Sequence, residues 1–219
     1  MSYAALRDKK AQLIRKARDG SCFLAPFSAS AITTLTTGVS ADLTPLPTTY
    51  EDLGWTNTDG VTFGRSTDIS NIQSFGSVEP TRSDVTKDTM TMGVVAQETK
   101  LLTMGLYTGA DVSGVQAAAT TGEVQIAKPA TPGFRYWRAY SVFVDTDDNG
   151  NEIYIGRFMP RARITELQEQ KMTDGDQAVE YGMTFTAYED ATLGYSHKWL
   201  WGGPGWLALL ADMGITQAP

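Results

Sequence analysis

Two stretches of the chain alternate strictly between apolar residues and small or polar ones, a period of two that indicates strands with one buried face. The apolar positions are Met90, Met92, Val94 and Ala96 in residues 85–96, and Val179, Tyr181, Met183, Phe185 and Ala187 in residues 178–188. The residues between them are mostly Thr, Gly and Glu. Such strands must pack their apolar face against a second layer.

Other segments also predict strands. Residues 134–144 and 153–159 are rich in aromatic and β-branched residues, and Asn149-Gly150 between them is a strong hairpin signal. We expect the second of these strands to continue over 162–169. Residues 53–63 read as a hairpin that turns at Asp59-Gly60, and residues 68–75 as a further strand. Because strands follow one another without alternating helices, the pattern favours a β-sandwich or barrel over a βαβ fold.

Helix formers are confined to three places. Residues 3–18 predict an N-terminal helix, residues 97–107 a short internal helix that stops at Gly109, and residues 206–213 a short C-terminal helix. We therefore expect a mainly β fold with these three helices. The expected organisation is a basic helical arm over residues 1–20 and a single β-sandwich domain over 21–219. Within that domain, residues 28–50, rich in Ser, Thr and Pro, form an extended arm or loop.

The charge of the chain is unevenly distributed. The whole sequence carries −7, with a pI of about 4.7. Residues 1–19 hold six Lys or Arg and two Asp, so this segment carries +4 and the remainder −11. An acidic body argues against a strongly basic nucleic-acid binder. A basic arm on an acidic body suggests salt-sensitive self-association. No apolar run approaches the ~20 residues of a bilayer span, and no secretory signal is visible, which favours a protein made in the cytoplasm.

Candidate chemical sites are few. The series Asp145-x-Asp147-x-Asn149-Gly150 matches the first half of a calcium loop, but position 12, which needs a bidentate Glu, is Gly156. A plain hairpin turn is the better interpretation. His197 is the only histidine and Cys22 the only cysteine. We interpret His197 as an ordinary surface or half-buried residue and Cys22 as a small buried hydrophobe. The sequence thus predicts no enzyme, no cofactor and no metal site.

The order of several short motifs resembles the major tail proteins, or tail tube proteins, of long-tailed phages of actinobacteria. The similar motifs are Phe23-Leu24-Ala25-Pro26, residues 53–63 (LGWTNTDGVTF), residues 72–77 (IQSFGS), Pro80-Thr81-Arg82, Gln97-Glu98-Thr99, Leu106-Tyr107-Thr108-Gly109 and residues 184–188 (TFTAY). The resemblance is strongest over residues 20–110. It implies a tail-tube β-sandwich whose copies form hexameric rings, stacked into a tube that delivers DNA to the host.

This resemblance also implies partners, location and functional surfaces. The partners are other copies of the chain, a tape-measure protein, and tail-tip and terminator proteins, with DNA passing only transiently and no membrane involved. The location is the virion tail, after assembly in the host cytoplasm. Candidate lumen-facing residues are Thr89, Thr91, Glu180, Thr184 and Thr186. Candidate inter-subunit residues are Leu6, Lys10, Leu13, Ala17, Pro45 and Pro47. Residues 28–50 and 108–122 are candidates for contacts between rings.

A second hypothesis is a β-sandwich binding module of a virion or cell surface that recognises carbohydrate. Its stacking faces would be the aromatic side chains of Tyr136, Trp137 and Tyr140, although such rings more often belong to a core. Solution mass separates the two hypotheses, because a binding module stays monomeric or forms a small closed oligomer.

Overall fold

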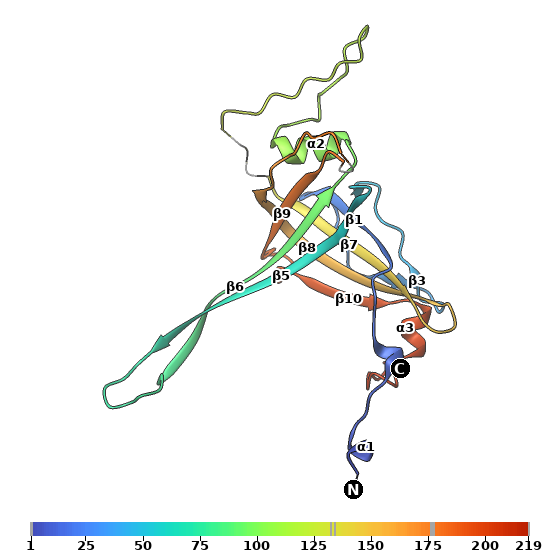
Figure 1. Cartoon of the computed structure of the whole chain (residues 1–219), viewed down its shortest axis with the longest axis vertical. Helices are drawn as coiled ribbons and strands as arrows, with labels where there is room; N and C mark the ends of the chain where they lie inside the picture. Colours follow the sequence, from blue (N-terminus) through green and yellow to red (C-terminus); the bar gives the residue numbers. More distant parts are fainter. Residues whose placement is uncertain (1, 132, 134, 176–177, 219) are drawn as a thin grey trace.

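The computed structural model describes residues 2–131, 133, 135–175 and 178–218. It is dominated by one antiparallel sheet, in the order β4-β1-β7-β8-β9-β6-β5, with β10 also paired to β8 (Figure 1). The strands are β1 (Asp19–Pro26), β2 (Thr36–Thr37), β3 (Asp42–Leu43), β4 (Glu51–Asp52), β5 (Thr56–Ile72), β6 (Arg82–Ala96), β7 (Trp137–Thr146), β8 (Glu152–Leu167), β9 (Tyr181–Tyr188) and β10 (Lys198–Gly202). The helices are α1 (Tyr3–Leu6), α2 (Leu101–Thr108) and α3 (Pro204–Ala208). The mainly β prediction is confirmed.

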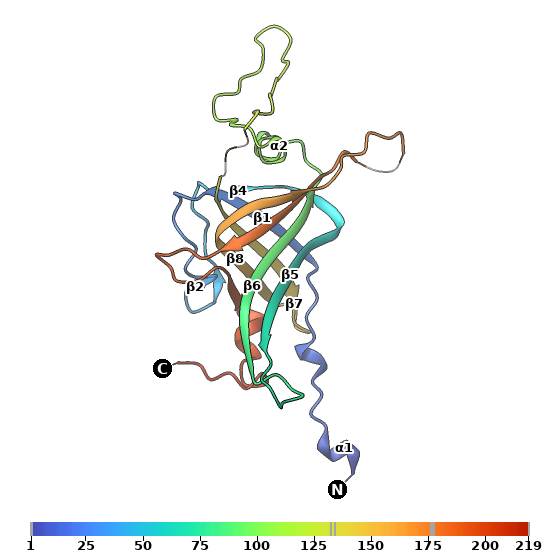
Figure 2. The same cartoon turned by 90° about the vertical axis from the view of Figure 1, so that its left-hand side faces the viewer.

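Strand β8 divides the sheet into two layers. On one side β8 pairs with β7 up to Ala162. On the other side it pairs with β10 over residues 154–158 and then with β9 over residues 161–167. The second half of β8 therefore joins β9, β6 and β5 in one four-stranded layer, which crosses over the layer of β4, β1, β7 and the first half of β8 (Figure 2).

The main core lies between these layers. The predicted apolar faces of β6 and β9 point into it, with Met92, Met183 and Phe185 at most 1% exposed. They meet Cys22 and Leu24 of β1 and their neighbours on β7 and β8. Side chains that fill this space make the fold a packed sandwich, as the alternation predicts.

A second core covers the opposite face of β7 and β8. Tyr140, Tyr154 and Phe158 are buried there beneath residues 28–50. This segment contributes Ile32, Leu35 and Tyr50, and it includes the small β2–β3 hairpin. Tyr50 also donates a hydrogen bond to the Ser30 carbonyl at 2.7 Å. The expected extended arm is thus a loop that packs closely on its own domain.

The predicted hairpin over residues 53–63 is wrong. This stretch enters a single strand, β5, and Gly60 lies at a bulge where the register with β6 shifts between Thr56 and Val61. Gly60 has a φ of +68°, the conformation that an Asp-Gly turn also requires. The real hairpin is longer: β5 and β6 continue together to a turn at residues 73–81 and project away from the body (Figures 1 and 2).

The predicted N-terminal helix is also wrong for most of its length. Only α1 and a 3₁₀ turn at Ala11–Leu13 are helical, and the remainder runs extended. Neither element has a side-chain cap, and six basic residues repel one another along this segment, so the isolated helix is marginal. The extended segment is stabilised instead by polar contacts with the end of β7, made by Arg15, Lys16 and Arg18.

The other two helices agree better with prediction. Helix α2 ends where expected, with Gly109 in the left-handed conformation. Helix α3 begins and ends earlier than the predicted 206–213, because Pro204 occupies its first turn and the following residues form turns. Strand β8 continues past Pro160 as predicted. In the described part of the chain, no helix is long and apolar enough to cross a bilayer.

Candidate assembly surfaces

The outer face of the four-stranded layer carries almost only small residues. Threonine and glycine positions on neighbouring strands lie directly opposite one another across β5, β6 and β9. Residues on this face are Thr62, Gly64 and Ser66 of β5, Thr89, Thr91, Gly93 and Val95 of β6, Gly182, Thr184 and Thr186 of β9, and Arg163, Thr165 and Glu166 of β8. We call this set the small-residue face. The face is nearly flat because most of its side chains are short.

Glycines on the small-residue face leave room for the threonines beside them. A Cβ on Gly93 would lie 2.6 Å from Oγ1 of Thr62, and a Cβ on Gly64 would lie 2.7 Å from Oγ1 of Thr91. The hydroxyls of Thr165 and Thr186 are 2.8 Å apart. Short side chains lying over glycines give a smooth hydroxylated surface with little side-chain mobility.

Both edges of this layer lack a strand neighbour within the described residues. Strand β5 pairs with β6 alone, and residues 163–167 of β8 pair with β9 alone. An exposed edge presents unpaired backbone N–H and C=O groups, which is a template for pairing with another chain. The layer can therefore extend at both sides by adding equivalent layers.

The candidate lumen residues are brought together by this geometry. Thr89, Thr91, Thr184 and Thr186 all lie on the small-residue face. Glu180 precedes β9, and its carboxylate accepts a hydrogen bond from the Gln97 amide at 3.0 Å. The alternation of β6 and β9 was the signal that located these threonines. That this face lines a lumen stays a prediction.

The candidate inter-subunit residues are more scattered. Leu6 is 68% exposed on α1. Lys10 is engaged within its own chain, since its ammonium donates to the Asp212 carbonyl at 3.0 Å and lies 3.4 Å from the Asp212 carboxylate. Leu13 is half-buried, and Ala17 lines a hollow beside Phe63 and Phe143.

Pro45 and Pro47 lie on the loop that covers the second core. Pro45 is exposed and Pro47 half-buried. Nearby Leu46 packs against the buried cluster. The loop over 108–122 extends beyond α2 at one end of the molecule (Figure 1). Contacts of these segments with another copy remain predictions.

The calcium-like series forms a hairpin turn, as expected. The Asp147 carboxylate accepts the backbone N–H groups of Asn149 and Asn151 and the Asn151 side-chain amide at 2.8–2.9 Å. These hydrogen bonds, with the Asn151 amide foremost, lower the pKa of Asp147. Asp145 points the other way, to Arg15 and the Lys16 backbone. No cluster of three metal-ligating side chains occurs among the described residues.

His197 is more deeply buried than expected. It lies among Phe63, Trp199 and Arg157, and in the described structure neither ring nitrogen has a hydrogen-bond partner. Burial first, and then the Arg157 charge, lower its pKa from 6.5 to about 4. His197 is therefore neutral at pH 7 and packs as an aromatic ring.

Cys22 is buried, as predicted. It is 1% exposed, and burial raises its thiol pKa to about 11 despite a hydrogen bond with Ser141. A protonated, inaccessible thiol is a poor nucleophile. The aromatic residues of the carbohydrate hypothesis are also engaged: Tyr140 is 2% exposed, and the Arg161 guanidinium lies 4.1 Å from the centroid of the Tyr136 ring.

Sequence reasoning missed one large feature, the projecting hairpin of β5 and β6. Its turn carries Phe75 and Val78, whose side chains are fully exposed. The available signal was the pair of apolar residues beside Gly76 in an otherwise polar stretch.

Comparison with known proteins identifies a family for the chain. Among curated proteins, no sequence matches the chain. A family model described as phage tail tube protein matches residues 8–203, which includes every strand of both layers. The chain belongs to the phage tail tube protein family.

Proposed function

We propose that this protein is the structural subunit of the tail tube of a long-tailed phage of the siphovirus type that infects actinobacteria. Copies assemble in the host cytoplasm into hexameric rings, the rings stack around a tape-measure protein between tail-tip and terminator proteins, and DNA later passes through the bore. The chain acts as a building block and not as an enzyme. Family membership supports the tail-tube role.

The observation that carries the proposal is the small-residue face with its two free edges. If β5 of one copy pairs with residues 163–167 of β8 in the next, the four-stranded layers close into a continuous barrel without edges. The small-residue face then turns toward the bore.

Such a face suits the passage of DNA. Phosphates bind strongly where Lys and Arg displace their counterions. The described part of β8 gives the small-residue face a cation and an anion, since Arg163 lies opposite Thr186 and Glu166 lies opposite Thr184, and the chain as a whole carries −7. DNA then meets hydroxyls and glycines in place of a basic surface. The basic arm at residues 1–19 adds a salt-sensitive contact, so stacking weakens as ionic strength rises.

Negative-stain electron microscopy at low and high salt tests the assembly. We expect rings or hollow tubes, with more stacking at low salt, and a loss of stacking when residues 1–19 are deleted. Monomers at both salt concentrations, even with tail-tip complexes added as initiators, would contradict the proposal.

The lumen assignment has its own test. Thr184→Lys places a cation on the small-residue face, and the matched control Thr192→Lys places one on the exposed turn between β9 and β10. In tails assembled from each variant, we expect slower DNA ejection for Thr184→Lys only. Equal ejection rates would show that the small-residue face does not line the bore.

A further inference from the structure

The guanidinium of Arg157 lies among aromatic rings and has no acidic partner in the part of the chain that the structure describes. Its Cζ atom is 5.4 Å from the centroid of the Trp201 ring, 5.7 Å from that of Phe63 and 6.0 Å from that of Trp199. The ion pairs of the described residues do not include Arg157. Its hydrogen bond there is a 3.5 Å contact from Nη1 to the carbonyl of the adjacent Gly156. Cation–π contacts orient the charge without neutralising it, so Arg157 can still pair with an anion.

The charge of Arg157 is only partly solvated. Burial lowers the pKa of its guanidinium, because the charged form loses contact with water. His197 packs beside Trp199, with ring centroids 4.3 Å apart, and it is neutral at pH 7 and supplies no compensating charge. The carboxylate of Asp145 on β7 is already engaged by the basic arm. A bound anion would therefore reduce the electrostatic cost of holding this half-buried cation.

A hollow of about 180 Å³ lies beside Arg157, and its walls are otherwise apolar. This volume is close to the cavity of about 150 Å³ that holds a benzene ring in a protein core. The Phe63 and Phe143 rings meet edge to face, with centroids 6.0 Å apart. The lining residues come from the N-terminal arm, β5, β7 and β8: Ala17, Val61, Phe63, Phe143, Ile155 and Arg157. The hollow therefore has the volume of one small ring and a single cationic side chain.

Strand β10 adds aromatic surface on the same side of the sheet. It lies at the part of the body away from α2 (Figure 1). In the register of β8 with β10, Trp199 lies opposite Arg157 and Trp201 lies opposite Ile155, so both indoles share the face of the guanidinium. Trp199 is 42% exposed and Trp201 is 46% exposed. Ring surface is therefore available to a ligand beside the guanidinium as well as in the hollow.

From this geometry we propose that the hollow beside Arg157 binds a small carboxylic acid with an apolar or aromatic group, in its ionised form. The apolar group fills the space between Phe63, Phe143 and Ile155, and the carboxylate accepts two parallel hydrogen bonds from the guanidinium. The surrounding rings already fix the guanidinium, so little side-chain entropy is lost on binding.

The composition of the lining favours a free acid over other anions. One guanidinium neutralises one carboxylate, whereas a phosphate carries up to two charges and would leave one of them half-buried and unpaired. A peptide segment would bring backbone N–H and C=O groups, and apart from Arg157 the described lining residues have no polar side chain to satisfy them. All of these residues belong to one copy, so the site does not depend on the proposed tube.

Titration of the full-length protein with 3-phenylpropionate tests the site. Calorimetry measures the affinity, and tryptophan fluorescence reports on Trp199 and Trp201 beside the ligand. The matched ligand is 3-phenylpropionamide, which has the same ring and no charge. We expect the acid to bind about ten- to a hundredfold more tightly than the amide, because only the acid makes charged hydrogen bonds to Arg157. Equal affinities, or no saturable binding of the acid at about 10 mM, would overturn the proposal.

Two substitutions of Arg157 assign the charge. Arg157→Gln should weaken binding of the acid about tenfold or more and leave binding of the amide unchanged. Arg157→Lys keeps the charge without the parallel donors, so its affinity should fall between these. Arg161→Gln is the matched control, because Arg161 lies on the same strand over the Phe27 and Tyr136 rings and outside the hollow. An Arg157→Gln protein that melts at the wild-type temperature and binds the acid as tightly as wild type would refute the proposed pairing.

A substitution on the N-terminal arm tests the hollow without touching either core. Ala17 is exposed and lines the hollow, so Ala17→Leu should fill the space and weaken the acid and the amide alike. Ala17→Ser is the matched control and should bind like wild type. Unchanged affinity in Ala17→Leu would place the apolar group elsewhere and overturn the proposal. Tighter binding of the peptide acetyl-Gly-Gly-Phe than of 3-phenylpropionate would also overturn it, because the hollow would then take the C-terminus of a partner chain.

Discussion

Replacing Asp145 should release the basic N-terminal arm from the body. Asp145 is 6% exposed, its carboxylate accepts the Lys16 backbone N–H at 3.1 Å, and this carboxylate lies 3.5 Å from the Arg15 guanidinium. In Asp145→Ala, the hydrogen bond to a charged acceptor is lost, which costs about 1.5–3 kcal/mol. The full penalty for a stranded buried charge, about 3–5 kcal/mol, is an upper bound.

The actual cost should stay near the lower range, because Arg15 belongs to an extended segment that can turn toward water. We therefore expect Asp145→Ala to lower the free energy of unfolding by about 2 kcal/mol, or the melting temperature by roughly 4–8 °C for a chain of this size. Asp145→Asn keeps an acceptor for Lys16 and should cost less.

Two assays check this reasoning. Thermal unfolding measures the stability change, and limited trypsin digestion measures cleavage within residues 7–18, which should accelerate in Asp145→Ala. Asp147→Ala is the matched control, because Asp147 holds the same turn without touching the arm. The reasoning is refuted if arm cleavage is as slow in Asp145→Ala as in the control.

Three further predictions concern the interior and the small-residue face. Cys22, with its thiol pKa raised to about 11, should resist thiol reagents at pH 8 in the folded protein and react once denatured; rapid native labelling would contradict its burial. Because the pKa of His197 falls from 6.5 to about 4 on folding, the unfolded chain binds an extra proton between these values, so stability should decrease as pH drops from 6.5 to 4. His197→Gln should flatten that part of the pH profile in denaturant titrations, and an unchanged slope would exclude this residue as its cause. Gly93→Ala should destabilise by about 1–3 kcal/mol through its clash with Thr62, and Thr62→Ala should rescue much of this loss in a double-mutant cycle; additive effects would show that the two sites are independent.

Strands with one buried face could be predicted from the sequence. The projecting hairpin, exposed on both faces, was predicted only in part, as the strand over residues 68–75 that overlaps the end of β5. Met92 and Phe185 alternate with threonine because a core lies on one side only. Residues 65–83 of the projecting hairpin are all exposed, so no alternation marks them. The Asn149-Gly150 turn was found because its signal is local.

Asp59-Gly60 has a similar local signal but forms a bulge. A glycine in the left-handed conformation fits both a hairpin turn and a β-bulge, and pairing with β6, which is distant in sequence, selects the bulge. The N-terminal arm is likewise determined by a residue distant in sequence. Its contacts with Asp145 stabilise an extended segment more than the helix propensity of its residues stabilises a helix.

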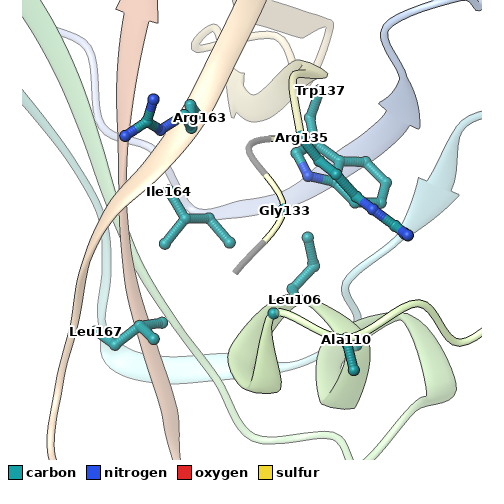
Figure 3. Close-up of a pocket in the computed structure, with 10 residues that line it drawn as sticks. Leu106, Ala110, Gly133, Arg135, Trp137, Arg163, Ile164 and Leu167 are labelled. Carbon is teal, nitrogen blue, oxygen red and sulfur yellow. The ribbon is translucent and has the colours of Figure 1, made fainter. Parts of the chain in front are cut away.

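The candidate surfaces also differ in whether the sequence could predict them. The threonines of the small-residue face were visible as the polar half of two alternating strands. The hollow beside α2 that Leu106, Trp137 and Leu167 line was not, because these residues are distant in sequence and meet only after the layers cross (Figure 3). The exposure of Phe75 could not be predicted either, since it depends on how far β5 and β6 extend from the body.

The sharing of β8 between the two layers has a mechanical consequence. A pull on the four-stranded layer along β8 is transmitted directly to β7, because the same sixteen-residue strand pairs with both β7 and β9. Sliding β8 along its axis must break the β7 ladder in shear, with many backbone hydrogen bonds resisting together and not one after another. Under axial force the subunit should therefore yield as one body, and its two layers should not peel apart.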